Sequence, residues 1–507
     1  MTQTSKFTLD GRTLSAARNL FGWLRVHKLV WSGGIFLVAL VTFITFQSSV
    51  IPDMGFWWDE LFSLWAGDPR IPFGEAFATR ILPDTNGPIY FSLVHLTQQA
   101  GVTGRAAFIV LNFFTIGICF AVILLRGSRA GMFATALSST AIALVTAPLL
   151  VYGPEGRAYG LAMALCAVIA FEGGRALSGG ETKRNDLIFA GLLSALAVWT
   201  HVFGAIFAGA FATALVVTGW LLMRRRDVAI LGLVIGSTTA AAFLVWMTFA
   251  FRLFTGTTSW IHFDQQWVFG AIWMMKLYLI GPAIGAVVAG AFVGLSLLPR
   301  HSRPVALALA ITGFLFIAIP LAVSFKMPIF LGRYLLVAGP ALLVLCVFLI
   351  RSHLVADGLP RVGREGLAAL GALLLVFPLI QGLSTASNHF SHRSVWLGQG
   401  AVLRVADSCP AGEVRTLVDA PILAGFEYYL EGKLKPVAPA ASPIRDVSEI
   451  NCPVFGWAEH YGGEWAANAD MARVLSDFRL TNATGLPLDI IRHSGGLVLA
   501  RADANLR

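Results

Sequence analysis

The residues best suited to acid–base chemistry stand directly after the first long apolar run of the chain. There Trp57 and Trp58 precede two adjacent carboxylates, Asp59 and Glu60. A carboxylate within about 3 Å of a hydroxyl group can take its proton and make it a nucleophile. Asp59 is therefore the candidate base, while Glu60 would orient the acceptor, hold Asp59 through a partner, or act on it as a nearby like charge. The alternative is that both are solvated acids beside an interfacial aromatic belt.

Cationic residues farther along the chain are candidates for binding an anion. Arg157 closely follows Glu155 between two apolar runs, and its guanidinium offers a planar fork of donors for a phosphate, with Glu155 keeping it oriented. Lys326 and Arg333 flank a later apolar turn, where they would clamp a phosphate head group and stabilise it as it leaves. The alternatives are a self-neutralising pair at a helix boundary and, for Lys326, a snorkelling anchor at the membrane interface.

His201 stands at the end of another apolar run. A single histidine in such a place is more often a hydrogen-bonded structural residue than a base or a ligand. No spacing of His, Cys and carboxylate residues calls for a metal site, so we predict no metal ligands, while a divalent ion stays compatible with the chemistry.

The elements that must position these residues are membrane helices. Of 507 residues, 56% are hydrophobic and only 13% are charged, and the mean hydropathy is +0.73. Soluble domains are roughly a quarter charged. Apolar runs of about 18 residues, long enough to cross a hydrocarbon core of about 30 Å, recur along the chain. We place spans near residues 29–46, 106–125, 131–151, 158–172, 187–201, 204–223, 228–250, 268–298, 305–324, 329–350 and 366–383.

The charge distribution gives the orientation of these spans. The basic leader, residues 1–28, and the Lys and Arg residues of the later short loops would face the cytoplasm under the positive-inside rule. Basic residues dispersed in this way do not form a nucleic-acid-binding patch, despite a net charge of +9. The apolar stretch from Pro88 to Ala100 is too short to span and is predicted to be a re-entrant or interfacial helix. The resulting 11 crossings leave residues 384–507 outside the cytoplasm.

This topology gathers the polar candidates on one side of the membrane, as expected for an enzyme that works at membrane depth. A transporter would instead distribute acids across the membrane and show paired repeats, for which the sequence gives no sign. The candidates at the outer face are Asp59, Glu60, Asp84, Glu155, Arg157, His201, Lys326 and Arg333.

The C-terminal residues 384–507 differ in composition from the membrane spans and are predicted to form a small α/β domain outside the cytoplasm. Cys409 and Cys452 both lie in it, where an oxidising compartment would let them pair, and two free thiols are the equal alternative. Strand-like runs alternate here with helix-like ones, and the strand-like runs cover residues 414–418, 453–457, 486–491 and 496–500.

Four motifs resemble, in the same order, those of the GT-C superfamily of membrane glycosyltransferases. The likeness is to the bacterial branch related to the protein O-mannosyltransferases (glycosyltransferase family 39) and to the lipid A aminoarabinose transferase. It covers a transmembrane domain of residues 29–383, in which residues 51–105 form the first outer loop. The motifs are Trp58-Asp59-Glu60, Asp84-Thr85-Asn86-Gly87-Pro88-Ile89-Tyr90, Glu155-Gly156-Arg157-Ala158-Tyr159 and Arg333-Tyr334-Leu335-Leu336.

The resemblance implies a sugar donor linked to a polyprenyl phosphate, inversion at the anomeric carbon, and an essential aspartate that matches Asp59. It also implies that Arg157 and Arg333 lie near the lipid phosphate. Relatives commonly have His and Pro where this chain has Asn86 and Gly87, a difference that bears on the substrate. We predict further substrate contacts at Trp58, Asp84, Asn86, Tyr90, Glu155, Tyr159 and His201.

Together these observations predict an α-helical polytopic membrane protein with a GT-C type bundle. Its function would be inverting transfer of a sugar from a polyprenyl-phosphate donor to a hydroxyl of a lipid, glycan or protein acceptor. The site would face the outer side of the inner membrane, with the N-terminus in the cytoplasm and the C-terminal domain in the periplasm. The alternatives are a transporter or flippase of lipid-linked sugars, and a non-catalytic assembly subunit.

Overall fold

The computed structural model describes most of the predicted membrane domain and the backbone of five strands near the C-terminus. The described residues are 28–50, 56, 58–84, 86–257, 265–266, 268–271, 300–327, 329–354, 380, 383–387, 412–417, 434–437, 455–458, 488–493 and 496–501.

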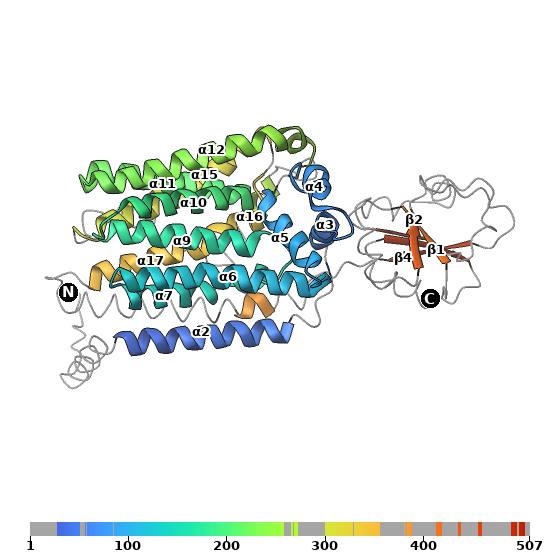
Figure 1. Ribbon diagram of the computed structural model, residues 1–507, viewed down its shortest axis with the longest axis horizontal. Helices are drawn as coiled ribbons and strands as arrows, with labels where there is room; N and C mark the ends of the chain where they lie inside the picture. The colour runs from blue at the N-terminus through green and yellow to red at the C-terminus, as the bar shows by residue number, and fades with distance from the viewer. Residues whose placement is uncertain are drawn as a thin grey trace, which may run out of the picture.

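The membrane domain is a bundle of long apolar helices that run side by side (Figure 1). Within the described residues, 7 helices are long and apolar enough to cross a membrane. A further helix, α10 (Arg184–Thr200), has 17 residues and packs among them. The long helices are α2 (Lys28–Val50), α6 (Gly104–Arg129), α9 (Tyr159–Leu177), α11 (Val202–Val217) continued by the π turn η3 (Thr218–Leu222), α12 (Arg226–Thr257), α15 (Arg303–Ser324), and α16 (Gly332–Leu335) joined through the 3-10 turn η4 (Leu336–Ala338) to α17 (Gly339–Leu354).

The outer surface of the bundle is what a lipid environment would solvate. On α6, Phe114, Ile118 and Leu125 are large apolar side chains with 67%, 48% and 50% of their surface exposed. At about 1.5 Å per residue, α6 is roughly 39 Å long, which exceeds the hydrocarbon thickness of about 30 Å. Length and exposed apolar surface together confirm the predicted class of polytopic α-helical membrane protein.

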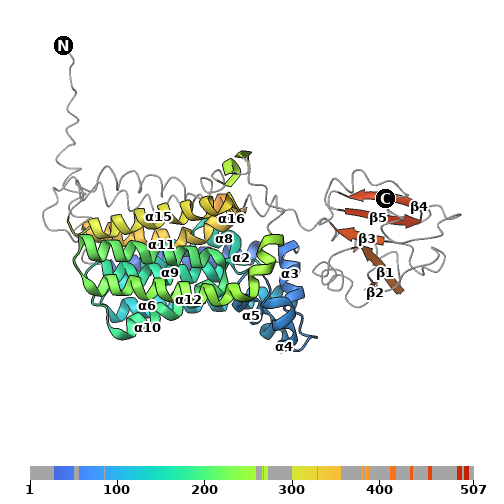
Figure 2. The same ribbon diagram turned by 90° about the horizontal axis from the view of Figure 1, so that it is seen from above.

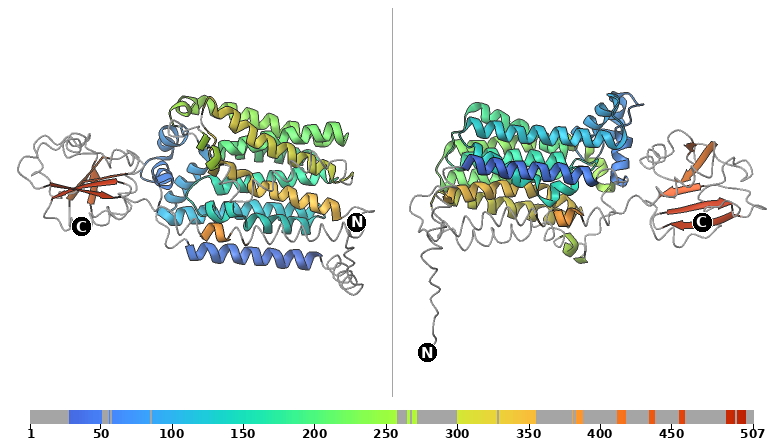
Figure 3. Two further views of the ribbon diagram at one scale, coloured as in Figure 1. Left: turned by 180° about the vertical axis from the view of Figure 1, so that it is seen from behind. Right: turned by 90° about the horizontal axis from the view of Figure 1, so that it is seen from below.

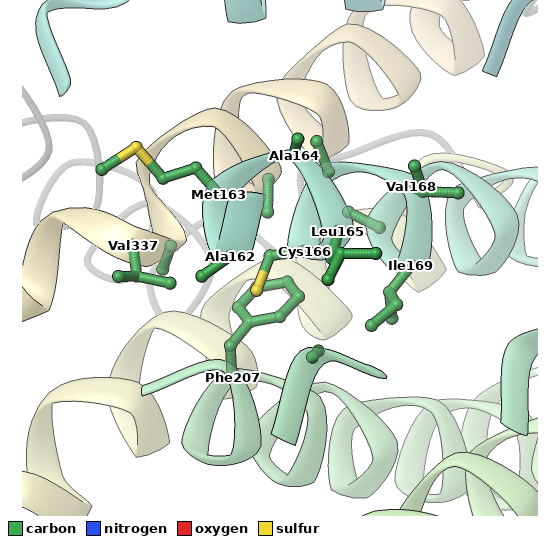
Figure 4. Packing of buried hydrophobic residues seen from close by; sticks show 14 of the residues in the cluster. Ala162, Met163, Ala164, Leu165, Cys166, Val168, Ile169, Phe207 and Val337 are labelled. Atoms are coloured by element: carbon green, nitrogen blue, oxygen red, sulfur yellow. The ribbon is translucent and has the colours of Figure 1, made fainter. Parts of the chain in front are cut away.

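Helix α9 forms the centre of the bundle, and all of its residues are buried. Its small side chains let neighbouring helices approach closely. Figure 4 shows the face of α9 that carries Ala162, Cys166 and Ile169 turned toward Phe207 of α11. A Cβ added at Gly173 would lie 2.3 Å from the Phe211 ring. The close packing around α9 fixes the positions of its two ends.

Short helices gather at one end of the bundle (Figure 3). They are α3 (Trp58–Ala66), α4 (Phe73–Ala76) with the π turn η2 (Phe77–Ile81), and α5 (Pro88–Gln99). Helix α5 corresponds to the apolar stretch predicted to be re-entrant or interfacial. Its Gln98 side chain donates a 2.6 Å hydrogen bond to the carbonyl of Gly67, which ties it to the end of α3.

The span predicted at residues 131–151 is not one continuous helix. The structure divides it into α7 (Phe133–Leu144), of 12 residues, and α8 (Ala147–Tyr152), of 6 residues. Pro148 lacks an N–H, and its ring would clash with the carbonyl of Leu144 if the helix continued. The proline instead occupies the first turn of a new helix, where its missing donor costs nothing.

At the end of the bundle away from α3, four buried or partly buried charges neutralise one another. Arg126 pairs with Glu172 at 2.7 Å and with Asp186, while Arg175 lies 3.0 Å from Asp186 and 3.2 Å from Glu172. These contacts join the C-terminal ends of α6 and α9 to the start of α10. The basic loops predicted to face the cytoplasm are attached at this end.

The C-terminal strands form one mixed sheet, which lies beyond the α3 end of the bundle in Figures 1 and 2. The strand order is β2-β1-β3-β5-β4, with β1 parallel to β2 and β3, and β5 antiparallel to β3 and β4. The strands are β1 (Gly412–Leu417), β2 (Leu434–Val437), β3 (Phe455–Ala458), β4 (Leu488–His493) and β5 (Gly496–Arg501).

Three predictions lie wholly or almost wholly outside the described residues. These are the spans at 268–298 and 366–383 and the pairing of Cys409 with Cys452. The count of 11 crossings and the α/β domain therefore stay predictions.

Candidate active site

The two adjacent carboxylates of the first outer loop begin helix α3. Asp59 and Glu60 lie in its first turn, where the helix N-terminus favours negative charge. The Asp59 side chain is 13% exposed and that of Glu60 is fully buried. Buried carboxylates need cationic or hydrogen-bonding partners. The two carboxylates have different partners and therefore different roles in the site.

Asp59 lies between two arginines that are far from it in the chain. Its Oδ2 atom is 3.2 Å from Nη2 of Arg333 and 4.0 Å from Nε of Arg157. Arg157 Nη1 also donates a 3.2 Å hydrogen bond to the backbone carbonyl of Asp59. Three elements thus converge on one ion-pair cluster: the start of α3, the turn between α8 and α9, and helix α16. We call Asp59, Arg157 and Arg333 the ion-pair cluster.

Glu60 contacts a different arginine. Arg105, at the start of α6, donates to both carboxylate oxygens of Glu60 at 2.5 and 2.9 Å, and its guanidinium lies 4.4 Å from the ring centroid of Phe56. The backbone N–H of Gly156 donates to the same carboxylate at 2.8 Å. Glu60 therefore joins α3 to α6 and to the turn that carries Arg157.

The turn before α9 is fixed at its carbonyl groups. The carbonyl of Glu155 accepts hydrogen bonds from the Asn112 side chain at 2.6 Å, the Arg157 N–H at 2.7 Å and the Tyr90 hydroxyl at 3.5 Å. A side chain at Gly156 would meet the Phe108 ring at 2.3 Å, so only glycine fits this turn without movement. These contacts set the direction in which the next side chain, Arg157, leaves the backbone.

Arg157 is held by aromatic faces as well as by charge. Its guanidinium lies 5.8 Å from the ring centroid of Phe62 and 5.7 Å from that of Phe91, within the range of cation–π attraction. Burial alone would lower the pKa of Arg157, but the charges of Asp59 and other neighbours raise it above its ordinary value. The guanidinium therefore stays charged in this largely buried position.

The second motif forms a tight turn that packs against the end of α10. Asp84 accepts hydrogen bonds from the backbone N–H and the side-chain amide of Asn86, at 2.6 and 3.0 Å. Burial raises the pKa of the Asp84 carboxyl, although the charge of Arg157 and these hydrogen bonds act in the opposite direction. A Cβ added at Gly87 would lie 2.0 Å from the carbonyl oxygen of Trp199. This close approach leaves no room here for the proline common in the resembling proteins.

An aromatic group borders the ion-pair cluster. The ring of Tyr159 lies 5.2 Å from that of His201 and 6.1 Å from that of Tyr334, and His201 and Tyr334 are 5.4 Å apart. The Arg333 guanidinium lies 5.5 Å from the Tyr334 ring. His201 ends α10 and caps α11, because its Nδ1 accepts the N–H of Phe203 at 3.1 Å.

The structure therefore brings most of the predicted site residues together. Asp59, Arg157 and Arg333 are in contact, and Tyr159 and His201 lie in the bordering aromatic group. Lys326 differs from these residues, because its side chain is exposed in the turn after α15. Trp58 begins α3, but its side chain is outside the described residues.

Two site residues were missed by sequence reasoning, Arg105 and Asn112. They are seven positions apart on α6, two turns of one face, and they hold Glu60 and the carbonyl of Glu155. The available signal was a charge and an amide on one face of an otherwise apolar span. Within the part of the chain that the structure describes, no three His, Cys, Asp or Glu residues come together as a metal site would require.

Comparison with known proteins identifies the fold. No family model matches the sequence, and no curated protein matches it. The structure is similar to that of ArnT from Cupriavidus metallidurans bound to undecaprenyl phosphate, with a TM-score of 0.53, 14% identity, and coverage of 96% of this chain and 99% of that one. The apo state of the same ArnT gives a TM-score of 0.50 with the same identity and coverage. The oligosaccharyltransferase of Archaeoglobus fulgidus, in complex with Zn and sulfate, gives 0.46 with 13% identity, covering 92% of this chain and 73% of that one.

At these identities the similarity establishes the fold. It extends over nearly the whole of both chains in the two ArnT structures. The chain therefore shares its fold with ArnT, which agrees with the resemblance to the GT-C superfamily seen in the four motifs.

Proposed function

We propose that this protein is an inverting glycosyltransferase that moves a sugar from a polyprenyl-phosphate donor to an acceptor hydroxyl. The observation that carries the proposal is the ion-pair cluster, in which one carboxylate and two guanidinium groups converge in a largely buried site at one end of a membrane bundle. Such a site supplies the two functions that the reaction needs, a base for the acceptor and cations for the leaving phosphate.

The two arginines suit a phosphate held at the membrane surface. Guanidinium groups offer paired donors in a plane, a geometry that matches phosphate oxygens. Their side chains are only 8% and 17% exposed, so water screens their charges weakly. The similar fold of ArnT, which binds undecaprenyl phosphate, supports a lipid of this class as the donor carrier.

The reaction follows as a single displacement. The donor phosphate takes up hydrogen bonds from Arg333 and Arg157, which weakens their hold on Asp59. The freed carboxylate accepts the proton of the acceptor hydroxyl while that oxygen bonds to the anomeric carbon. The bond from the anomeric carbon to the phosphate oxygen breaks with its electron pair, and the two arginines stabilise the charge that the phosphate gains.

Glu60 takes a positioning role in this mechanism. Its bonds to Arg105 and to the Gly156 N–H hold the turn of Arg157 against the start of α3. A displacement of about 1 Å in such a support can cost on the order of 100-fold in rate. Glu60 thus acts through the position of Arg157 and not by contact with the acceptor.

The orientation in the membrane is part of the proposal. The balanced cluster of Arg126, Glu172, Arg175 and Asp186 lies at the opposite end from Asp59 and next to the Arg-rich loops. Under the positive-inside rule that end faces the cytoplasm of a bacterial cell. The site and the C-terminal sheet then face the periplasm from the inner membrane, where a lipid, glycan or protein acceptor is available.

The test compares the purified wild-type protein with Asp59→Asn, using membrane extract as the source of donor and acceptor. Asparagine keeps the size of the side chain but cannot accept the proton, so sugar transfer should fall by a factor of about 100 or more. The matched control is Asp68→Asn, because Asp68 also pairs with an arginine, Arg70 at 2.8 Å, but lies outside the ion-pair cluster.

The outcomes separate the candidate functions. Loss of transfer in Asp59→Asn with normal transfer in Asp68→Asn supports the base. Equal transfer in Asp59→Asn and wild type refutes that role for Asp59. If the wild-type protein binds lipid-linked sugar but transfers none, transport or a non-catalytic assembly role replaces the enzymatic proposal.

A further inference from the structure

Two buried polar groups beside the ion-pair cluster have no role in the reaction described above. The Tyr159 hydroxyl and the Nε2 atom of His201 have no hydrogen-bond partner among the described residues. Both side chains belong to residues that are only 1% exposed. Buried polar atoms without partners are rare in folded proteins and call for a specific explanation. We call Tyr159 and His201 the donor pair.

The hydrogen bond at Nδ1 of His201 defines which ring nitrogen carries the proton. Nδ1 accepts the N–H of Phe203 at 3.1 Å, so this nitrogen carries no proton. The ring is then the neutral tautomer, whose one proton is on Nε2. His201 therefore presents an N–H donor at Nε2, and the phenol of Tyr159 presents an O–H donor beside it.

The position of the donor pair indicates the kind of group that it binds. The two rings are 5.2 Å apart, and both lie against Tyr334, whose ring is 5.5 Å from the Arg333 guanidinium. Tyr159 follows Arg157 by two residues at the start of α9. Both donors thus border the two cations of the ion-pair cluster, where an anionic oxygen is favoured over a neutral hydroxyl.

We propose that the Nε2–H of His201 and the hydroxyl of Tyr159 donate hydrogen bonds to phosphate oxygens of the polyprenyl-phosphate donor, as neutral partners of Arg157 and Arg333. This inference rests on the proposed function, since it names two further residues that recognise the donor at the same site. The ligand class is a lipid-linked phosphate, and the recognised atoms are its non-bridging oxygens.

Neutral donors have a specific use next to two arginines. A third cation would repel Arg157 and Arg333 and would bind Asp59 more tightly, which would oppose its release as a base. Neutral hydrogen bonds add stabilisation without that repulsion. They strengthen as the phosphate gains negative charge during cleavage of its bond to the sugar. No proton moves to or from the donor pair in this step.

The experiment measures binding of undecaprenyl phosphate, undecaprenol and inorganic phosphate to purified protein in detergent, together with transfer kinetics. Tyr159→Phe removes only the hydroxyl. His201→Asn removes the ring donor but keeps an oxygen suited to capping α11, because asparagine is a preferred N-cap residue. The control is Phe203→Leu, because the Phe203 ring packs 5.3 Å from that of Tyr334 and its loss alters this packing without removing a side-chain donor.

A hydrogen bond to a charged group corresponds to about a tenfold to hundredfold change in affinity. Tyr159→Phe and His201→Asn should each weaken undecaprenyl phosphate binding by at least about tenfold. Undecaprenol binding should stay within about twofold of wild type, because undecaprenol lacks the phosphate. Phe203→Leu should leave the affinity for both lipids nearly unchanged, even if it lowers thermal stability.

Four results would overturn the inference. If both variants bind undecaprenyl phosphate as wild type does, while wild type transfers sugar, the donor pair does not contact the phosphate and the proposed function stands. If they lose undecaprenol binding equally, their role is in packing. If wild type binds inorganic phosphate as tightly as the lipid, or does not bind the lipid at all, the lipid assignment fails, and in the latter case the proposed function fails with it.

Discussion

Replacing Gly87 by alanine tests whether the turn of the second motif must touch the end of α10. The backbone of Gly87 has φ −63° and ψ 152°, which any residue adopts without strain. Any effect of the substitution must therefore come from the added methyl group. That methyl would lie 2.0 Å from the carbonyl oxygen of Trp199 and 2.1 Å from its carbonyl carbon.

The size of the effect follows from this overlap. Real Cβ contacts are essentially never shorter than 3.0 Å, and both of the atoms met at Trp199 are backbone atoms, which cannot rotate away. The turn and the helix end must then separate by about 1 Å, at a cost of roughly 1–3 kcal/mol for overpacking. The same shift would move Asp84 relative to His201 and lower the transfer rate on the order of 100-fold.

The assay is sugar transfer by purified Gly87→Ala, with the apparent unfolding midpoint in detergent measured on the same sample. Gly117→Ala is the control, because a Cβ at Gly117 meets no atom within 4 Å. Because alanine is a better helix former than glycine, Gly117→Ala in α6 should raise the free energy of unfolding by up to about 1 kcal/mol. If Gly87→Ala keeps wild-type transfer and midpoint, the turn does not approach α10 and the reasoning is refuted.

Two further substitutions test the surroundings of the site. Glu60→Gln removes the carboxylate that pairs with Arg105, whose side chain is only 12% exposed. The substitution should lower the free energy of unfolding by about 3–5 kcal/mol. The control Glu75→Gln, on the exposed surface, should leave the unfolding midpoint unchanged. Burial raises the pKa of Asp84 in the folded protein, so the fold loses stability as pH rises from the ordinary pKa of the carboxyl to this raised value; the cost persists at higher pH and is absent at acid pH. Asp84→Asn, which can still accept the Asn86 N–H, should therefore raise the midpoint at pH 7 more than at pH 4; an equal rise at both pH values would contradict the buried charge.

The sequence by itself determined the class of protein and most of the helices. Long apolar runs must become helices in a bilayer, because every backbone N–H and C=O needs a partner there. Length alone indicated that the run from Pro88 to Ala100 is too short to cross the hydrocarbon core. The apolar pattern did not predict the helix break within residues 131–151, where Pro148 begins a new helix.

The four motifs also contain the charged residues that the structure brings into contact in the ion-pair cluster. Asp59, Arg157 and Arg333 stand out because charges at membrane depth are costly and need a reason. The sequence left open the role of each. It could not decide whether Arg157 binds phosphate or only neutralises a neighbouring charge. It also could not decide which of Lys326 and Arg333 lies in the site.

Only the tertiary structure decided which charges meet. Asp59 pairs with Arg157 and Arg333, while the adjacent Glu60 turns to Arg105 and the Gly156 N–H. Neighbours in a helix point about 100° apart, so their partners depend on which helices pack on each side. That packing is set by small residues along α9 and by the close approach of Gly87 to α10, contacts between segments that are distant in the chain and that no local pattern specifies.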